Sequence, residues 1–188
     1  MLRKALILCV ISYGLYGCAA GVLAVGAGSS ALLYDERNLS TIYQDQKIVH
    51  QAHALVKKNP TLEKTHLSFS SINHRLLITG QTPKVQQRVL IGQLVKKIPR
   101  VKEVINKATV AHPLPPVAIS KDLWITSKIK AAMLQKPHLH SAQIKVVTEN
   151  KVVYLMGIVS KRQAHLATQI AQKTLGINKV VQLFEVIT

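Results

Sequence analysis

The chain repeats itself internally, and this repeat constrains its fold more than any other feature of the sequence. Identical residues recur at a constant offset of 77 positions, which falls to 76 near the end of each copy, where Val104 matches Val180. The identities at the larger offset include Asp45 with Asp122, Ala54 with Ala131, Asn73 with Asn150, and Gly80 with Gly157. We therefore predict two homologous modules, residues 45–112 and residues 120–188.

Both copies contain the same order of predicted elements. Apolar residues at helical spacing predict the helices, and alternating apolar residues predict the strands. In the first copy these are a helix at residues 46–58, strands at 66–70 and 75–79, a helix from about 83 to 98, and a strand at 101–110. The predicted fold class is α+β, with two α-β-β-α-β modules whose helices pack on one face of a small mixed sheet.

Proline and serine residues predict where helices begin and where the modules are joined. Thr82 and Pro83 suggest an N-cap and the first helical residue in the first copy. Ser160 and Gln163 have the spacing of a capping box at the same point of the second copy. Residues 113–119 lie in the proline-rich stretch HPLPPVAIS and are predicted to form a short, stiff linker.

The N-terminus has the layout of a secretory signal peptide. Arg3 and Lys4 precede an apolar run at residues 5–13, and LYGC follows at residues 15–18. This layout predicts a signal peptide at residues 1–17, lipidation of Cys18, and a flexible tether that continues to residue 44. Tyr16 departs from the small residue usual at its position, and an uncleaved signal anchor is the alternative interpretation.

The chain is strongly basic, with a formal net charge of +17. Such an excess indicates a polyanionic partner, or simply a solubilising surface. In an exported protein, phospholipid headgroups fit this charge and nucleic acid does not. Both cysteines, Cys9 and Cys18, lie in the leader, so the mature chain is predicted to have no disulfide.

Two tandem units with a glycine after the second strand resemble BON domains. Behind a lipidation signal, the chain resembles the dual-BON outer-membrane lipoproteins of the DolP type. The resemblance is carried by DLWITSKIKAAML at residues 122–134, by IKVVTENKVVYLMGIVSKRQA at 144–164, and by DERN at 35–38. It implies an exported, non-enzymatic protein at the periplasmic face of the outer membrane. It also implies a role in envelope integrity and at the division site, with anionic phospholipid bound by the second module.

The single tryptophan, Trp124, lies among lysines on the first helix of the second copy. Its counterpart in the first copy is Lys47, and because lysine is seldom buried, the position is predicted to be at the surface. An indole ring among ammonium groups is typical of an anchor in a lipid headgroup layer. The predicted lipid-binding residues are Lys121, Trp124, Ile125, Lys128, Lys130, Ala131 and Leu134, and the predicted ligands are phosphatidylglycerol and cardiolipin.

Two alternatives for this helix stay open. Trp124 could pack against the other module or the proline-rich linker, because buried contacts between modules favour aromatic residues. The same surface could instead dock on an envelope protein such as the outer-membrane assembly machinery, which would make the chain an adaptor. Ile125 also belongs to the apolar set that is predicted to face the core.

Catalytic and metal-binding patterns are not evident in the sequence. His50 and His53 lie one helical turn apart, but no cysteine or carboxylate close in sequence supplies a third ligand. No nucleophile elbow, phosphate-binding glycine loop or HExxH motif is present. We therefore expect neither an enzyme, nor a cofactor, nor a metal site.

Overall fold

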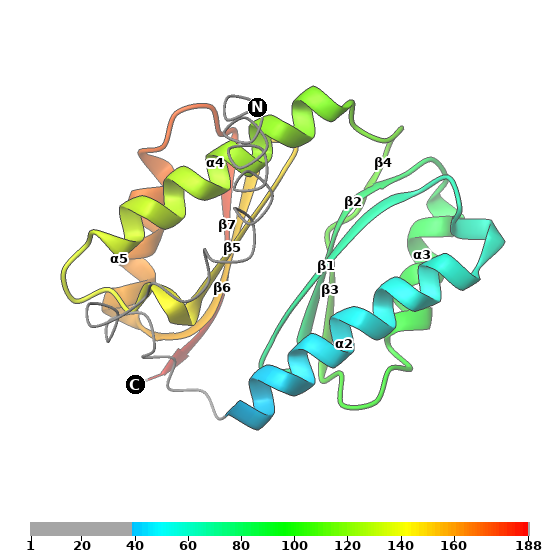
Figure 1. Cartoon of the computed structure of the whole chain (residues 1–188), viewed down its shortest axis with the longest axis horizontal. Helices are drawn as coiled ribbons and strands as arrows, with labels where there is room; N and C mark the ends of the chain where they lie inside the picture. The colour runs from blue at the N-terminus through cyan, green and yellow to red at the C-terminus, as the bar shows by residue number, and fades with distance from the viewer. Residues whose placement is uncertain (1–38, 188) are drawn as a thin grey trace, which may run out of the picture. The chain divides into compact units, whose positions relative to one another are not determined.

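Each repeat folds into a small mixed sheet with two helices on one face, as predicted (Figure 1). This computed structural model describes residues 39–187. The predicted signal peptide, Cys18 and residues 19–38 of the predicted tether lie outside the described residues.

The first module contains two helices and four strands. They are α2 (Leu39–Lys58), β1 (His66–Ile72), β2 (Arg75–Thr82), α3 (Val85–Val95), β3 (Glu103–Asn106) and β4 (Thr109–Val110), with the 3-10 turn η2 (Pro60–Leu62). Strand β1 is antiparallel to β2, whereas β3 and β4 both run parallel to β2. The last strand is thus divided, and the prediction of one continuous strand is wrong. The Asn106 side chain explains the break, because it accepts a hydrogen bond from the Ala108 N–H at 3.2 Å and donates one to the Arg88 carbonyl at 2.9 Å.

The second module repeats this order with an undivided last strand. Its elements are α4 (Pro116–Leu134), β5 (Ile144–Glu149), β6 (Val152–Ser160), α5 (Lys161–Gln172) and β7 (Lys179–Ile187), with the 3-10 turn η3 (Ser141–Gln143). Strand β6 lies in the centre, antiparallel to β5 and parallel to β7. The same topology in both copies is what the internal repeat predicts.

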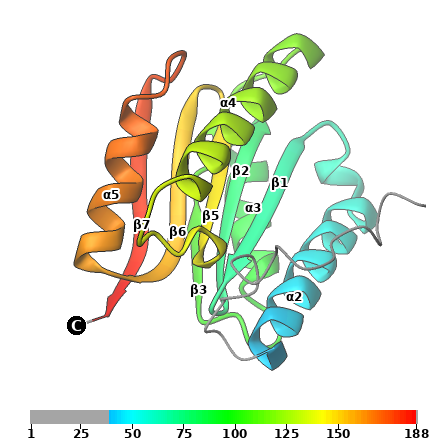
Figure 2. The ribbon, with the colours of Figure 1, turned by 60° about the vertical axis from the view of Figure 1, so that its left-hand side comes forward.

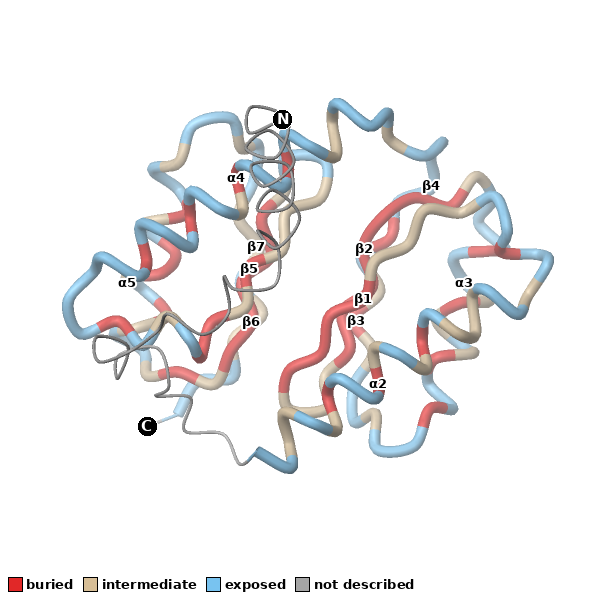
Figure 3. Tube along the Cα trace, viewed as in Figure 1, coloured by how far each residue is buried: buried red, intermediate tan, exposed pale blue. Residues whose placement is uncertain are grey.

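The two faces of each sheet are buried in different ways. On one face of β6, Val153 and Leu155 pack with Ile129 of α4 and with Ala167 of α5 in the core of the second module. Figure 2 shows the two helices of this module on the same side of its sheet. Figure 3 shows the central strands as mostly buried, with exposed residues along the helices. Because successive side chains of a strand alternate, β6 also presents a second apolar set on its other face.

That second set packs against the first module. Tyr154 and Met156 of β6 form a buried cluster with Ile72, Leu77 and Ile105 of the first module. Hydrogen bonds across the same junction join Gln81 Nε2 to Glu149 Oε1 at 2.6 Å, Arg75 Nη1 to the Leu183 carbonyl at 2.8 Å, and Asn73 Nδ2 to Glu185 Oε2 at 2.9 Å. The two module cores and this cluster all belong to a single compact unit of the chain, residues 35–188.

A buried aspartate on the first helix of each module holds the hairpin turn that follows. Asp122 accepts hydrogen bonds from the backbone N–H groups of Asn150 and Lys151, at 2.7 and 2.9 Å. Both turn residues have positive φ, 48° and 61°, as a type I′ turn requires. In the first module, Asp45 binds the corresponding turn, accepting from the N–H groups of Asn73 and His74 and from the Ser71 hydroxyl. These aspartates explain two of the identities that reveal the repeat.

A glycine in the second strand of each module lets the neighbouring backbone approach. A Cβ atom on Gly80 would lie 2.0 Å from the carbonyl oxygen of His66, and Gly80 has a φ of 107°. A Cβ atom on Gly157 would lie 2.5 Å from the carbonyl oxygen of Gln143. Neither position can accept a side chain unless the backbone moves.

Two helices begin earlier than predicted. Helix α2 begins at Leu39, so residues 39–44 of the predicted tether are helical. Ile42 and Asp45 have the same inward-facing spacing as Ile48 and Ala52 further along the helix. Helix α4 begins at Pro116, so residues 116–119 of the predicted linker are helical as well. Proline is well tolerated in the first turn of a helix, where its missing N–H needs no partner.

The two predicted helix caps have different outcomes. Ser160 caps α5, where its hydroxyl accepts a hydrogen bond from the Gln163 N–H at 3.3 Å, as predicted. The prediction of Thr82 as a cap is wrong, because Thr82 remains in β2 and pairs with Val110. Lys84 takes the cap position of α3 instead, and its N–H donates to the Gln87 side chain at 3.0 Å.

Candidate functional site

Helix α4 presents apolar side chains on two opposite sides. Its inner side contributes Ile125, Ile129 and Met133 to the core of the second module. Its outer side exposes four large apolar residues, namely Val117 at 66 %, Leu123 at 64 %, Trp124 at 53 % and Leu134 at 53 % exposure. A surface helix of a globular protein usually has a polar outer side, so this arrangement makes the outer side of α4 a candidate binding surface.

We name this surface the outer face of α4 and define it by six residues. At 3.6 residues per turn, Val117, Trp124 and Ala131, spaced seven residues apart, lie along one stripe of the helix, and Leu123, Ser127 and Leu134 lie along the adjoining stripe. Ser127 is tied to the helix, since its hydroxyl donates to the Leu123 carbonyl at 2.9 Å. The outer face thus combines apolar side chains with small ones.

Lysines lie beside this apolar stripe. The Lys128 Nζ lies 4.3 Å from the centroid of the Trp124 ring, within the range of a cation–π contact. Lys121 is exposed about one turn before Trp124. The contact with Lys128 places a positive charge next to the indole. An aromatic ring beside an ammonium group is a combination suited to an anionic interface.

The structure brings together five of the seven residues predicted to bind lipid. Lys121, Trp124, Lys128, Ala131 and Leu134 are all exposed on or beside the outer face of α4. Ile125 is a correction: it is only 3 % exposed and packs in the core of the second module, so it cannot contact a membrane surface. The prediction that Trp124 is at the surface is confirmed, and at 53 % exposure the ring is not fully buried between the modules.

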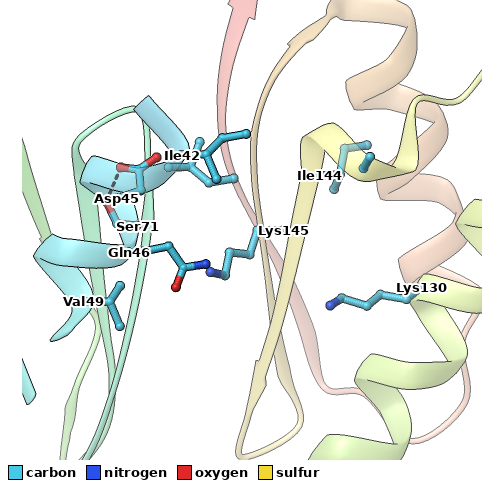
Figure 4. A pocket seen from close by; sticks show the side chains of 10 residues that line it. Ile42, Asp45, Gln46, Val49, Ser71, Lys130, Ile144 and Lys145 are labelled. Carbon is cyan, nitrogen blue, oxygen red and sulfur yellow. Dashed lines mark hydrogen bonds between the residues drawn. The ribbon is translucent and has the colours of Figure 1, made fainter. Parts of the chain in front are cut away.

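Lys130 lies apart from the indole, beside a cavity between the two modules. The cavity has a volume of about 240 Å³ and is bounded by Ile42 and Gln46 of α2 and by Lys130, Ile144 and Lys145 of the second module. Figure 4 shows Lys130 and Lys145 among the side chains around this space. Lys130 therefore adds charge on the side of α4 that faces the first module.

Sequence reasoning missed Val117 and Leu123 as members of the exposed surface. Val117 lay in the predicted linker, and Leu123 follows Asp122 directly in a helix with apolar residues on both sides. Comparison of the two copies could have identified both. The first-module counterparts of Val117, Leu123, Trp124 and Leu134 are Ser40, Gln46, Lys47 and Lys57.

The first module has polar residues at these four positions, although its helix α2 also exposes Leu39 and Tyr43. All four counterpart residues are exposed, and none has an apolar side chain. Because fold position and helix are the same, the apolar residues of α4 are not needed to build the module. They distinguish the outer face of α4 from the matching positions of α2.

Several carboxylates of the described chain are held by neighbouring groups and leave the surface charge strongly positive. Asp45 and Asp122 bind the hairpin turns, and Glu103 pairs with Arg75 at 2.6 Å. Glu149 is partly buried at the junction between modules, and burial raises its pKa although the Gln81 hydrogen bond lowers it. Burial also raises the pKa of Tyr154 beside it.

Two further findings concern chemistry and membrane insertion. Within residues 39–187, no group of three histidine, cysteine, aspartate or glutamate side chains is arranged to hold a metal ion. His53 instead packs edge-on against Phe69, with ring centroids 5.0 Å apart. No helix in the same range has the length and apolar character to cross a membrane.

The chain is similar in sequence to one protein family and to several known proteins. The BON domain family matches residues 44–112 and residues 121–188. The chain is 31 % identical over 185 residues to the outer membrane lipoprotein DolP of Haemophilus influenzae, covering 98 % of this chain and 96 % of the relative. It is 29 % identical over 150 residues to a 21 kDa hemolysin of Actinobacillus pleuropneumoniae, covering 79 % and 77 % of the two chains. A solved C-terminal domain of CdsD, from the type III secretion system of Chlamydia trachomatis, aligns over 77 % of this chain and 67 % of its own, with a TM-score of 0.31 and 16 % identity.

Proposed function

Because this chain belongs to the BON domain family and is an outer-membrane lipoprotein of the dual-BON, DolP type, we propose that its second module binds anionic phospholipid through the outer face of α4. The observation that carries the proposal is the exposed Trp124 beside Lys128 on the outer face of α4, where the first module has Lys47 in place of the indole. We further propose that this binding supports the integrity of the outer membrane and acts at the division site.

The magnitudes fit a surface that works beside an anchor. Each lysine near an anionic leaflet contributes about 1 kcal/mol, so Lys121 and Lys128 together give only a modest affinity. Partial burial of Trp124 and the two leucines in the headgroup layer adds a term that salt does not screen. Acyl chains on Cys18 would hold the module near the bilayer and raise its effective concentration, so that a modest affinity is sufficient.

The proposed location is the periplasmic face of the outer membrane, after removal of residues 1–17 and acylation of Cys18. Mass spectrometry of the mature protein is expected to find a lipidated N-terminal Cys18. Palmitate labelling is expected to disappear in Cys18→Ala. Detection of an intact leader would contradict this part of the proposal and would indicate a signal anchor.

The lipid-binding proposal is tested on residues 35–188, which retain the whole folded unit. The emission of Trp124, the only tryptophan of the chain, is followed as vesicles of zwitterionic lipid, or vesicles containing phosphatidylglycerol or cardiolipin, are added. We expect a blue shift with the anionic vesicles alone, and a weaker shift at high salt.

An emission that ignores both kinds of vesicle would overturn the proposal. It would favour the alternative of a protein adaptor, in which the same exposed apolar face docks on an envelope protein such as the outer-membrane assembly machinery. Equal shifts with zwitterionic and anionic vesicles would retain membrane binding but contradict the proposed role of the lysines.

A further inference from the structure

A second exposed apolar residue of the second module lies outside α4, in the loop between α5 and β7. This is Leu175, which is 84 % exposed, more than any other large apolar residue of the described chain. An isolated leucine on a surface needs no explanation, but this one lies in a loop that hydrogen bonds hold on both sides.

Hydrogen bonds fix the loop at both ends. Before Leu175, the Thr174 N–H donates to the Ala171 carbonyl at 3.0 Å, and the Thr174 hydroxyl donates to the Ile170 carbonyl at 3.1 Å. After it, the Asn178 N–H donates to the Lys151 carbonyl at 2.8 Å. Ile177 packs against the core of the module. Leu175 is therefore held in an exposed position by a rigid loop.

The same loop lies against α4. Gly176 has a φ of 90°, and a Cβ atom built on it would lie 3.7 Å from Cδ1 of Ile125. Ile125 directly follows Trp124 in α4, so the loop adjoins the turn of the helix that carries the indole. The exposed leucine and the exposed indole are thus presented by neighbouring segments of one module.

The charges around the loop match those around α4. Lys173 and Lys179 are exposed on either side of Leu175 in the sequence. The first module has the same loop, in which Arg100 takes the place of Gly176 with a φ of 72°. There the counterpart of Leu175 is Pro99. In this loop, a large flexible apolar side chain occurs only in the second module.

From these contacts we infer that Leu175 is a second point of insertion into the anionic phospholipid bilayer, beside Trp124. This inference rests on the proposed function and extends the lipid-binding surface from α4 to the α5–β7 loop. A bilayer is the chosen partner because both apolar points are exposed, are flanked by lysines, and lie on neighbouring segments of one module. An inserted point outside α4 would fix the rotation of the module about the axis of this helix, which contacts along α4 alone would not do.

The test uses residues 35–188, which contain no cysteine because Cys9 and Cys18 precede them. Leu175→Cys is labelled with an environment-sensitive fluorophore, and Pro99→Cys carries the same label at the matching loop of the first module. Vesicles with and without phosphatidylglycerol are added, and the label and Trp124 are read separately. We expect the label at position 175 and Trp124 to shift to the blue together, while the label at position 99 stays unchanged.

An unlabelled variant measures the effect of the native side chain. We expect Leu175→Ser to weaken binding to phosphatidylglycerol vesicles about tenfold in a sedimentation assay, because most of the transfer free energy of a leucine is lost. Its melting temperature is expected to match that of the unchanged chain, since the side chain makes little contact with the core.

The possible outcomes separate the inference from the proposed function. A shift of Trp124 without a shift at position 175 would overturn the inference and leave the lipid-binding role of α4 intact. Silence at both positions would remove the proposed function and the inference together. An equal shift from the label at position 99 would mean that the fluorophore itself enters the membrane, and unchanged binding of Leu175→Ser would then reject the inference.

Discussion

Trp124 and Lys128 form an exposed contact on one helix turn that the matching turn of the first module lacks. The ammonium group lies 4.3 Å from the centre of the indole ring, and the ring is more than half exposed. In the first module, Lys47 takes the place of the indole on an otherwise similar helix. The substitution that distinguishes the modules is thus also the one that tests the proposed surface.

Trp124→Lys gives the second module the residue of the first. We expect its affinity for anionic vesicles to fall about tenfold or more, because the inserted ring is lost. We expect the free energy of unfolding to change by less than about 0.5 kcal/mol, because exposed substitutions have small effects. Vesicle sedimentation and urea unfolding measure the two quantities. The reciprocal change Lys47→Trp is the control, and undiminished binding of Trp124→Lys would argue against the proposed site.

Asp122 lies two residues from Trp124 and has a structural role only. Asp122→Ala would leave the N–H groups of Asn150 and Lys151 without the carboxylate that accepts from them. We expect the free energy of unfolding to fall by about 3 kcal/mol, since hydrogen bonds to a buried charge are worth about 1.5–3 kcal/mol each. Urea unfolding of Asp122→Ala and of its counterpart Asp45→Ala checks this. A change below about 1 kcal/mol in both variants would contradict the role of the aspartates.

At the scale of the element, α4 differs from α2 in its outer side and not in its inner side. Both helices bury an aspartate, an isoleucine and further apolar residues at matching positions. Only α4 exposes leucines at positions 123 and 134, where α2 has Gln46 and Lys57. Because packing in the core constrains only the inner side of the helix, the outer side can vary, and its residues differ between the two copies.

The double variant Leu123→Gln, Leu134→Lys converts the outer face of α4 toward that of α2. We expect binding to anionic vesicles to weaken about tenfold or more and to become more sensitive to salt, because the remaining attraction is mostly electrostatic. Binding is measured by sedimentation at low and high ionic strength. The matched control is Val85→Gln, Val89→Gln, which removes two exposed apolar residues from α3 in the first module. Equal losses in both double variants would show that the effect is not specific to α4.

At the scale of the whole molecule, the sheet faces without helices join the two modules. Tyr154 and Met156 pack with Leu77 and its neighbours, so a strand such as β6 is covered on both sides. The hydrogen bond between Gln81 and Glu149 lies at this junction, and Gln81 also accepts from the Leu114 N–H at 3.2 Å. One glutamine thus links the first module, the connecting segment and the second module.

The raised pKa of Glu149 at this junction predicts that the free energy of unfolding depends on pH. Burial raises the pKa of Glu149, so the folded state holds the proton more tightly than the unfolded chain does. The free energy of unfolding therefore falls as the pH rises from the ordinary glutamate pKa through the raised value, because the carboxyl group ionises over this range. At pH values below the ordinary pKa this loss of stability is absent. We expect Glu149→Gln, which can still accept from Gln81, to raise the free energy of unfolding at about pH 7 by less than about 1 kcal/mol, because the group is partly exposed.

The measurement is urea unfolding of Glu149→Gln and the unchanged chain at about pH 7 and about pH 4. The difference between the two proteins should shrink toward zero at the lower pH, where the glutamate is protonated. Glu185→Gln is the control, since Glu185 is exposed and also accepts a hydrogen bond across the junction. A loss of stability in Glu149→Gln at neutral pH would mean that the ionised carboxylate has a net favourable role.

Much of the fold followed from the repeat, and the errors have local physical causes. The order of helices and strands was predicted because apolar periodicity and glycine breaks are short-range signals. The division of the last strand at Asn106 was missed, because it depends on a hydrogen bond to the distant Arg88 carbonyl. The early starts of α2 and α4 were missed, because prolines and polar residues there resemble a linker.

The candidate site shows the same limit. Comparison of Trp124 with Lys47 correctly predicted an exposed indole. Ile125 was assigned to both the core and the surface, because one apolar residue beside another does not reveal which of them faces inward. No helical or strand periodicity identified Leu175 as a candidate site residue, since the position of its loop beside α4 depends on the contact between Gly176 and Ile125.

The sequence by itself determined the two modules, their α-β-β-α-β order and the exposed position of the indole. These properties depend on periodicity and on comparison between the copies, both of which are present in the order of residues. Only the tertiary structure decided that the free sheet faces pack together, that Lys130 faces a cavity, and that a distant loop lies beside α4. Such contacts join residues far apart in the chain, and they depend on how the folded elements pack rather than on any local pattern.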